Sequence, residues 1–307
     1  MEGWTSVGFD DSNWTSTAIR YAATANNATV QMLQSQMFEP IQHISTRPPL
    51  KASTSPFAGI QIVAFGQNQA AVVRLKHVMC DRGTNITIQH AEVLQHPPYG
   101  PQDGSLDFTS NRNATATDTY ICRGDPMGES YIPTFTQHGF RYAQISGLDY
   151  ALNEQELEAV ELHSNVRPTS SILFSQPILN EIQHLVVWSL KSNMMSVQTD
   201  CPQRDERKGW LGDAAMTAEA AVYNYDLSAF YGQWINQMVD AQHEQVSEFD
   251  GSMPNFVPSI GFTTPGAPNW QSGFPTILWS MLMHTGDRDI VTAHHDSLVR
   301  YYNYFQS

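Results

Sequence analysis

The sequence predicts an antiparallel β-sandwich followed by stacked helical hairpins, and the change falls near Val166-Arg167-Pro168. Before this point, apolar and polar residues alternate or run apolar over short stretches, which is typical of strands. After it, apolar residues recur with the period of an α-helix. The length of 307 residues and the apolar fraction of 41% allow several domains, each with its own core.

The strand-like stretches are separated by turn clusters such as Asp81-Arg82-Gly83, and none of the segments between them has a helical period. They cover residues 59–78 (with a short polar break), 85–94, 118–122, 131–135, 140–145 and 157–163. Many short strands without intervening helices predict an antiparallel sandwich, which we assign to residues 51–166. Residues 1–50 predict a separate, partial strand unit.

Residues 167–307 predict helices joined mostly by short turns, as in stacked hairpins. Ser175 is a suitable N-cap for the first helix, with Pro177 in its first turn. Further helices are expected over residues 214–225, from an Asp226 cap onward, and over 275–285 and 287–304. One connection, from about Ser247 to Phe274, is much longer. A loop of that length is usually functional, and its aromatic residues argue against disorder.

The charge balance restricts the class of partner. The chain has 16 Lys and Arg against 30 Asp and Glu, a net charge of −14, and only 15% of its residues are charged. Nucleic acids and anionic membrane surfaces require a basic face. No apolar run approaches the roughly 20 residues of a membrane span. We therefore expect no nucleic-acid or membrane partner, and the composition suits a neutral ligand.

The compartment signals are mixed. The first residues lack the basic and apolar regions of a secretory signal. Four sequons for N-glycosylation nevertheless occur, at Asn13, Asn27, Asn85 and Asn113. Cys80, Cys122 and Cys201 have no metal-ligand spacing. A Cys80–Cys122 disulfide in an extracellular chain and three partly buried thiols are both compatible with the sequence.

The densest polar stretch is Asp200–Asp213, between two predicted helices. It contains four carboxylates and three basic side chains. Acids paired with Arg204 or Arg207 would have a lowered pKa, whereas an acid shielded beside Trp210 would have a raised one. Two carboxyls in contrasting environments are what general acid catalysis of glycoside cleavage requires. An exposed, salt-bridged loop would have the same composition.

This stretch reads DCPQRDERKGWLGD and resembles the signature of α-L-rhamnosidases (glycoside hydrolase family 78), which are inverting enzymes with an (α/α)6 toroid. Further segments resemble the β-sandwich that precedes the toroid in that family: Gly66–Asn68, Ala91–Leu94 and Thr136–Tyr142. Phe9–Trp14 is similar to a carbohydrate-binding-like sandwich further upstream. The resemblance covers nearly the whole chain.

The resemblance implies hydrolysis of terminal α-L-rhamnosides, or of rhamnose-containing polysaccharide, with inversion. Glu206 matches the general acid, which protonates the glycosidic oxygen. The implied substrate-binding residues are Asp200 and Asp213 for sugar hydroxyls, Trp210 and Trp270 for the sugar ring, and Arg204, which binds or orients unless it only pairs with Asp205. Ser272 stands where the family often has an aspartate. We expect no metal and no cofactor, because the chain has no zinc spacing and no phosphate-binding loop.

The likeness stops short of the second half of the toroid. The family's general base is a glutamate far downstream, and no position of this chain matches it. At about 40–50 residues per helical hairpin, residues 167–307 supply only the first half of a toroid. We therefore expect a fragment or truncated product of a larger secreted or cell-associated rhamnosidase. Uncovered apolar helix faces should then favour self-association or partial disorder after about residue 225.

Two other functions fit the same residues. One is a non-catalytic carbohydrate-binding or interaction module that keeps the acid but lacks the base. The other is an enzyme of different specificity that uses a base within the chain. The nearest carboxylates for that role are Asp213, Glu244, Glu248 and Asp250, for which surface solvation or helix capping is the favoured interpretation.

Overall fold

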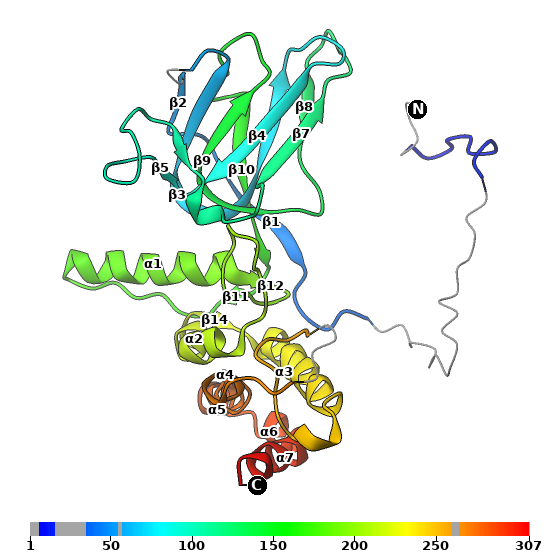
Figure 1. The fold of residues 1–307 in the computed structure, drawn as a ribbon, viewed down its shortest axis with the longest axis vertical. Helices are drawn as coiled ribbons and strands as arrows, with labels where there is room; N and C mark the ends of the chain where they lie inside the picture. Colours follow the sequence, from blue (N-terminus) through cyan, green and yellow to red (C-terminus); the bar gives the residue numbers. More distant parts are fainter. Residues whose placement is uncertain (1–5, 16–34, 55–56, 260–263, 307) are drawn as a thin grey trace. The chain divides into compact units, whose positions relative to one another are not determined.

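A computed structural model describes residues 6–15, 35–54, 57–259 and 264–306 (Figure 1). By spatial contacts the chain falls into two units, Met1–Gln36 and Met37–Ser307. In the first unit, residues 6–15 form turns in which the ring centroids of Phe9 and Trp14 lie 5.8 Å apart. The strand unit predicted over residues 1–50 lies partly outside the described residues and stays a prediction.

The second unit contains an antiparallel sheet with the strand order β1-β10-β3-β9-β4-β7, in which β2 and β8 also pair with β3. The bounds of these strands are β1 Ile41–Arg47, β2 Lys51–Thr54, β3 Ile60–Val78, β4 Asn85–Ala91, β7 Thr117–Ile121, β8 Glu129–Tyr131, β9 His138–Ser146 and β10 Leu157–Ser164. A separate hairpin of β5 (Val93–Leu94) and β6 (Leu106–Asp107) precedes the 3-10 helix η1 (Thr109–Asn111).

The long strand β3 makes the sheet curl. Its first part pairs with β2 and β9, and its second part with β10 and β8. The register with β9 shifts between Ala64 and Gln69, which absorbs the polar break seen in the sequence. Such irregularities bend a strand and increase its twist. The predicted antiparallel β region is confirmed, and it forms one curled sheet.

Both faces of β3 are buried, which explains its nearly continuous apolar sequence. Val63, Phe65 and Leu75 belong to the largest core cluster of the sheet. Ile62 packs on the opposite face with Leu106 of the β5–β6 hairpin. The hairpin that leads into η1 is therefore anchored to the sheet by apolar contacts.

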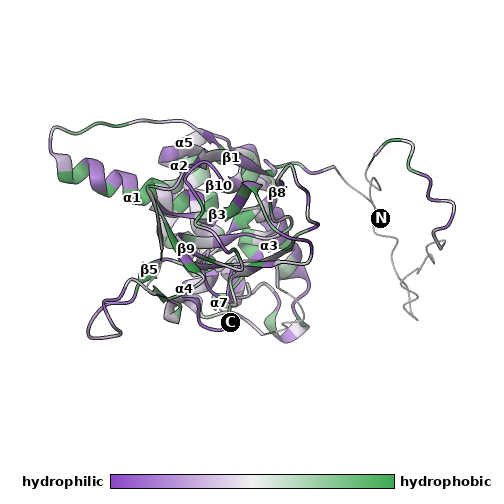
Figure 2. Cartoon of the chain, turned by 90° about the horizontal axis from the view of Figure 1, so that it is seen from above, coloured by the Kyte–Doolittle hydropathy of each residue, from purple (hydrophilic) through white to green (hydrophobic). Residues whose placement is uncertain are grey.

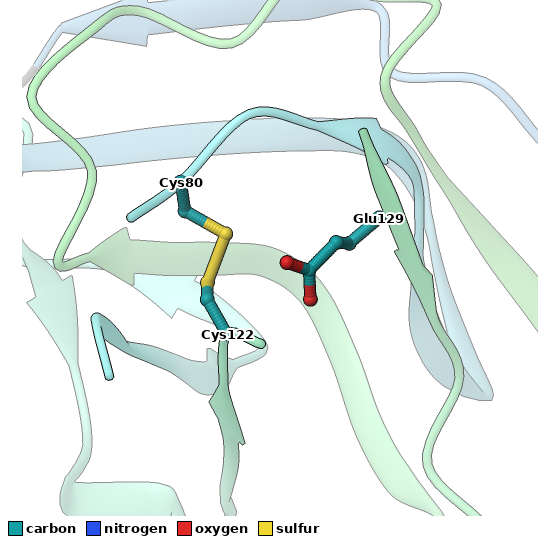
Figure 3. A group of neighbouring side chains, drawn as sticks. All are labelled: Cys80, Cys122 and Glu129. Atoms are coloured by element: carbon teal, nitrogen blue, oxygen red, sulfur yellow. A yellow bond between two sulfur atoms is a disulfide. The ribbon is translucent and has the colours of Figure 1, made fainter. Parts of the chain in front are cut away.

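Cys80 and Cys122 form a disulfide, with a Cα–Cα distance of 6.2 Å and a sequence separation of 42 (Figure 3). The bridge joins the segment after β3 to the residue that follows β7. Of the two arrangements compatible with the sequence, the structure has the disulfide. Cys201 is a free, buried thiol.

The carboxylate of Glu129 points toward this disulfide (Figure 3). It accepts hydrogen bonds from the Tyr120 hydroxyl and from the backbone N–H groups of Arg123, Gly124 and Asp125. Burial raises the pKa of Glu129, but these hydrogen bonds outweigh it and hold the pKa at about 2. An ionised carboxylate therefore ties the loop after Cys122 to the sheet.

The remainder of the second unit is mainly helical. The helices are α1 Pro177–Asn193, α2 Leu211–Asn224, α3 Ser228–His243, α4 Pro268–Gln271, α5 Gly273–Thr285, α6 Asp289–Ala293 and α7 His295–Gln306. Short strand pairs and a 3-10 helix connect them: β11 Arg167–Pro168 with β14 Tyr225–Asp226, β12 Met194–Met195 with β13 Val197–Gln198, and η2 Ser247–Phe249. The predicted succession of a β region and a helical region is confirmed.

Several helix ends differ from the sequence prediction. Gln176, not Ser175, is the N-cap of α1, and no side chain caps this end. The second helix begins at Leu211, so that Asp213 lies in its first turn, where the helix dipole favours a carboxylate. The expected Asp226 cap of the third helix is wrong, because Leu227 is the N-cap of α3, and Asp226, one residue earlier, accepts hydrogen bonds from the backbone N–H and the hydroxyl of Ser228 in a turn. The predicted helix over 287–304 is divided into α6 and α7 around His294.

Helix α1 lies between the sheet and the other helices (Figure 1). At its C-terminal end, Lys191 pairs with Glu161 of β10 at 2.5 Å, and the Ser192 hydroxyl accepts the backbone N–H of Ala70. Along α1, Ile182 and Leu185 are 50% and 63% exposed. Figure 2 shows both hydrophobic and hydrophilic residues along this helix. The self-association expected from uncovered helix faces stays a prediction. Among the described residues, no helix is both long and apolar enough to cross a membrane.

Candidate active site

The loop between β13 and α2 carries most of the predicted site residues. Asp200 and Lys208 close its neck, because the Asp200 N–H donates to the Lys208 carbonyl at 3.1 Å and the Lys208 N–H donates to Asp200 Oδ1 at 2.8 Å. The Asp200 carboxylate thus accepts the Lys208 N–H with one oxygen, and its other oxygen lies 3.4 Å from Arg204 Nη2. The motif therefore forms a closed loop whose first aspartate is fixed from within.

Glu206 lies inside this loop and is 21% exposed at its side chain. Its Oε2 accepts hydrogen bonds from Arg204 Nε at 3.0 Å and from Arg112 Nη1 at 3.1 Å. Carboxylate oxygens of Asp200 and Glu206 and the sulfur of Cys201 lie within 4.8 Å of one another. The predicted acid is therefore neither in bulk water nor fully buried, and two guanidinium groups hold one of its oxygens.

Arg112 is a site residue that the sequence analysis missed. It belongs to the sheet region and follows η1, and its Nε also donates to Asp205 Oδ1 at 2.8 Å. The hydrogen bond from Arg112 is the largest cause that lowers the pKa of Asp205, and Asn113 adds another. No motif marks Arg112, because it lies 94 positions before Glu206 in the sequence.

The loop also rests on the start of β9. Gly139 donates its backbone N–H to the carbonyl oxygen of Pro202 at 3.0 Å, and Arg207 Nη1 donates to the carbonyl oxygen of Gln137 at 2.7 Å. These contacts involve the segment Thr136–Tyr142, one of those that resemble the family upstream of the toroid. The sheet and the helical region thus share the candidate site.

Asp213, in the first turn of α2, is an exposed residue beside this loop. Partial desolvation of its carboxyl is the largest cause that raises the pKa of Asp213, and the carboxylates of Asp200 and Glu206 add to it. Asp200 and Glu206 thus act on Asp213 electrostatically, as expected for groups gathered at one site. A carboxyl with a raised pKa beside an ionised one is a common feature of active sites.

Aromatic rings pack together where this loop leads into α2. The ring of Trp210 meets Phe256 edge to face at 5.1 Å between centroids and Trp270 at 6.4 Å. A Cβ atom on Gly212 would lie 2.8 Å from the ring of Trp270, so only glycine allows this ring to pack against the start of α2. The indole N–H groups of Trp210 and Trp270 have no partner among the described residues.

Three of the four carboxylates considered as internal bases, all except Asp213, lie away from this loop. Asp250 forms an ion pair with Arg300 of α7. Glu244 is the C-cap residue of α3, and Glu248 lies in η2. Both glutamates are exposed. Among the described residues, no hydrogen bond or ion pair links these three carboxylates to the loop of Glu206.

Three groups of side chains in the described part of the chain have metal-ligand chemistry, and each is otherwise engaged. The sulfurs of Cys80 and Cys122 are bonded to each other. The rings of His90 and His138, beside Asp118, are stacked at 4.1 Å and 17°, so their lone pairs do not converge on one point. At Cys201, burial raises the thiol pKa to about 11, so the thiolate that metals bind is disfavoured.

Comparison with known families assigns both regions of the chain. The bacterial alpha-L-rhamnosidase concanavalin-like domain matches residues 58–163, and the bacterial alpha-L-rhamnosidase 6 hairpin glycosidase domain matches residues 167–307. The chain belongs to the α-L-rhamnosidase family. The boundary between the two matches falls where the sequence changes from strand to helix periodicity.

Individual rhamnosidases agree with this assignment. The chain is 33% identical to an α-L-rhamnosidase of Streptomyces avermitilis over 94% of its length and 26% of that protein. A solved structure of the Streptomyces avermitilis α-L-rhamnosidase complexed with L-rhamnose has a TM-score of 0.88 at 31% identity, covering 99% of this chain and 28% of that one. The α-L-rhamnosidase from Dictyoglumus thermophilum has a TM-score of 0.82 at 35% identity, covering 89% and 29%.

The chain is short relative to these proteins. It spans between 26% and 31% of the length of the curated rhamnosidases that it matches.

Proposed function

We propose that this rhamnosidase-family chain carries the acid side of an inverting glycosidase site for terminal α-L-rhamnosides, with Glu206 as the general acid. The observation that carries the proposal is the setting of Glu206. Its carboxylate lies within reach of Asp200 and beside two arginines, in a loop that continues directly to Trp210. A general acid needs partial shielding from water and a fixed orientation, and this setting supplies both.

In this proposal the other motif residues bind the sugar. Asp200 and Asp213 accept hydrogen bonds from its hydroxyl groups, and Arg204 orients the two carboxylates that it contacts. Trp210 and Trp270 offer apolar ring surface. Such a combination of aromatic faces and a few convergent polar groups is typical of small-ligand sites.

The proposed general base is a carboxylate that this chain does not contain. Inverting glycosidases place their two carboxyls roughly 6.5–9.5 Å apart to leave room for water. Asp200 has an oxygen within 4.8 Å of Glu206, which is too close for that role. Residues 167–307 would then form the first hairpins of an (α/α)6 toroid. The substrate would be a rhamnose-containing glycoside, as the L-rhamnose complex of the Streptomyces avermitilis relative suggests.

Azide rescue tests the acid without requiring a base. Azide attacks C1 of an aryl α-L-rhamnoside from the opposite face, the bond from C1 to the aglycone oxygen breaks, and Glu206 gives its proton to that oxygen. The expected product is β-L-rhamnosyl azide. Glu206→Gln should slow its formation by about 100-fold for a poor leaving group and much less for dinitrophenolate. The exposed Glu244→Gln is the matched control, with an expected rate close to that of the wild type.

The outcomes separate the candidate functions. Equal rates for Glu206→Gln and the wild type with a poor leaving group would contradict the assignment of the acid. Binding of L-rhamnose without any azide product would favour the non-catalytic carbohydrate-binding module. Hydrolysis at a full rate without azide would require a base within the chain.

A further inference from the structure

We propose that Arg112, which the sheet region supplies, is a positioning residue for Glu206, and that it fixes the orientation of that carboxyl. This inference rests on the proposed role of Glu206 as the general acid. It assigns the sheet a part in the chemistry in addition to its structural role.

The contacts of Arg112 span two consecutive carboxylates of the loop. Its Nε donates to Asp205 Oδ1 at 2.8 Å, and its Nη1 donates to Glu206 Oε2 at 3.1 Å. One planar guanidinium thereby sets the direction of both side chains, since its donors have a fixed geometry. Asn113, the next residue, also hydrogen-bonds to Asp205. The segment after η1 therefore binds the loop at Glu206, the proposed proton donor, and at its neighbour Asp205.

The backbone of Arg112 suggests that its side chain is needed there. Its φ of 53° and ψ of −114° lie in a region that favours glycine. A residue with a side chain is strained in such a conformation, and strain of this kind clusters at functional sites. The surroundings hold it in place, because the buried side chain of Asn111 donates to the carbonyl oxygen of His90 at 2.9 Å. A glycine would satisfy the backbone better, but it would not provide a guanidinium group.

The charges around Glu206 make the contribution of Arg112 specific. The positive groups that face it are Arg112 and Arg204, and Arg204 is shared with Asp200. The negative or acidic groups are the carboxyls of Asp200, Asp205 and Asp213 and the thiol of Cys201. Without Arg112, one shared arginine would face all of these carboxylates. The side chain of Glu206 would then be held by one guanidinium group in place of two, and would be less fixed.

The test is azide rescue by the full chain with two aryl α-L-rhamnosides, one with a poor leaving group and one that releases dinitrophenolate, together with amide hydrogen exchange. Arg112→Gly removes the guanidinium and relieves the backbone strain, so folding should be retained. Arg112→Lys keeps a charge but not the fork. Arg123→Ala is the matched control, because Arg123 forms a similar exposed ion pair with Asp125 elsewhere on the sheet region.

In azide rescue, we expect Arg112→Gly to lower kcat by about tenfold for the poor leaving group, with little change in KM, and much less for dinitrophenolate, which needs little help from an acid. Arg112→Lys should lose less, and Arg123→Ala should match the wild type. Amide hydrogen exchange in residues 203–208 should also become faster.

An unchanged kcat in a folded Arg112→Gly variant, or an equal loss with both leaving groups, would overturn the proposal. Arg112→Asn provides a second variant without the guanidinium, since asparagine tolerates positive φ better than most residues. Failure of the proposed function has a different signature. In that case the wild type would neither bind L-rhamnose nor give azide product, although amide exchange in residues 203–208 would still respond to Arg112→Gly.

Discussion

The backbone N–H of Gly139 donates to the carbonyl oxygen of Pro202 at 3.0 Å and so joins β9 directly to the loop of Glu206. The approach is close. A Cβ atom on Gly139 would lie 2.7 Å from Pro202 Cγ and 2.8 Å from the backbone nitrogen of Gln203. The sheet therefore supports the loop through its main chain, in addition to the side-chain contacts of Arg112 and Arg207.

This contact predicts that Gly139→Ala destabilises the protein. The added methyl group would be too close to the backbone of the Glu206 loop, so this loop must shift. We expect the free energy of unfolding to fall by about 1–3 kcal/mol. Gly232→Ala is the control. Gly232 lies within α3 and has no atom within 4 Å of an added Cβ, so alanine there should stabilise by about 0.5–1 kcal/mol. Urea titrations followed by circular dichroism measure both, and effects of the same sign would contradict this account of Gly139.

The Cys80–Cys122 disulfide should contribute substantially to stability. Cross-linking residues 42 positions apart restricts the unfolded chain by about 4 kcal/mol in the chain-entropy model. The double variant Cys80→Ser/Cys122→Ser should therefore unfold at a much lower temperature or urea concentration. Adding a reductant should lower the stability of the wild type and leave that of the double variant unchanged. If the reductant lowered the stability of both proteins equally, its effect would not come from the Cys80–Cys122 disulfide.

Glu129 predicts a defined pH dependence of stability. Its pKa is about 2 in the folded protein and 4.5 in the reference state, so the unfolded chain takes up the proton first as the pH falls. The contribution of Glu129 is therefore complete above about pH 4.5 and is lost progressively toward pH 2. Glu129→Gln should be less stable than the wild type at pH 7, and this difference should shrink as the pH falls through that window.

The stability of Glu129→Gln must be compared with that of the wild type at each pH, because His90 also makes the folded protein less stable in acid. Burial, followed by the nearby His138, lowers the pKa of His90 to about 3, so protonation of the unfolded chain below about pH 6.5 disfavours folding. Both the wild type and Glu129→Gln share this effect. The exposed Glu154→Gln serves as the control and should follow the wild type at every pH. A gap between Glu129→Gln and the wild type that stayed constant down to pH 2.5 would contradict the assignment.

The sequence located the regular elements because local signals determine them. The alternation in 85–94 and 157–163 and the helical period of 275–285 correspond to β4, β10 and α5. The ends of α1 and α2 were less predictable. Pro177 fits the first turn whether Ser175 or Gln176 precedes it, and Asp213 is as favourable inside the first turn as before it.

The site was only partly predictable, for a physical reason. Asp200, Arg204, Glu206 and Asp213 are close in sequence, so a single motif reveals them. Arg112 acts through contacts that form only when distant segments meet, and it has no local pattern. Gly139 lies in Thr136–Tyr142, which resembles the family, but its contact with Pro202 also forms only in the folded chain. A curled sheet is similarly invisible locally, because the two halves of β3 pair with different neighbours only in the folded chain.

The ring cluster of Trp210, Phe256 and Trp270 gives a last prediction, on ligand binding. If Trp270 packs against the sugar, Trp270→Ala should weaken L-rhamnose binding by about 5–10-fold, through the loss of buried aromatic surface. Gly212→Ala should have a similar effect without removing the tryptophan, since its methyl group would displace the ring. Trp279→Ala is the control, because Trp279 is 62% exposed on α5. Ligand-observed NMR titration measures all three. If Trp270→Ala and Trp279→Ala bound L-rhamnose equally well, Trp270 would not belong to the sugar site. If only Gly212→Ala bound it more weakly, the cause would be a disturbance of α2.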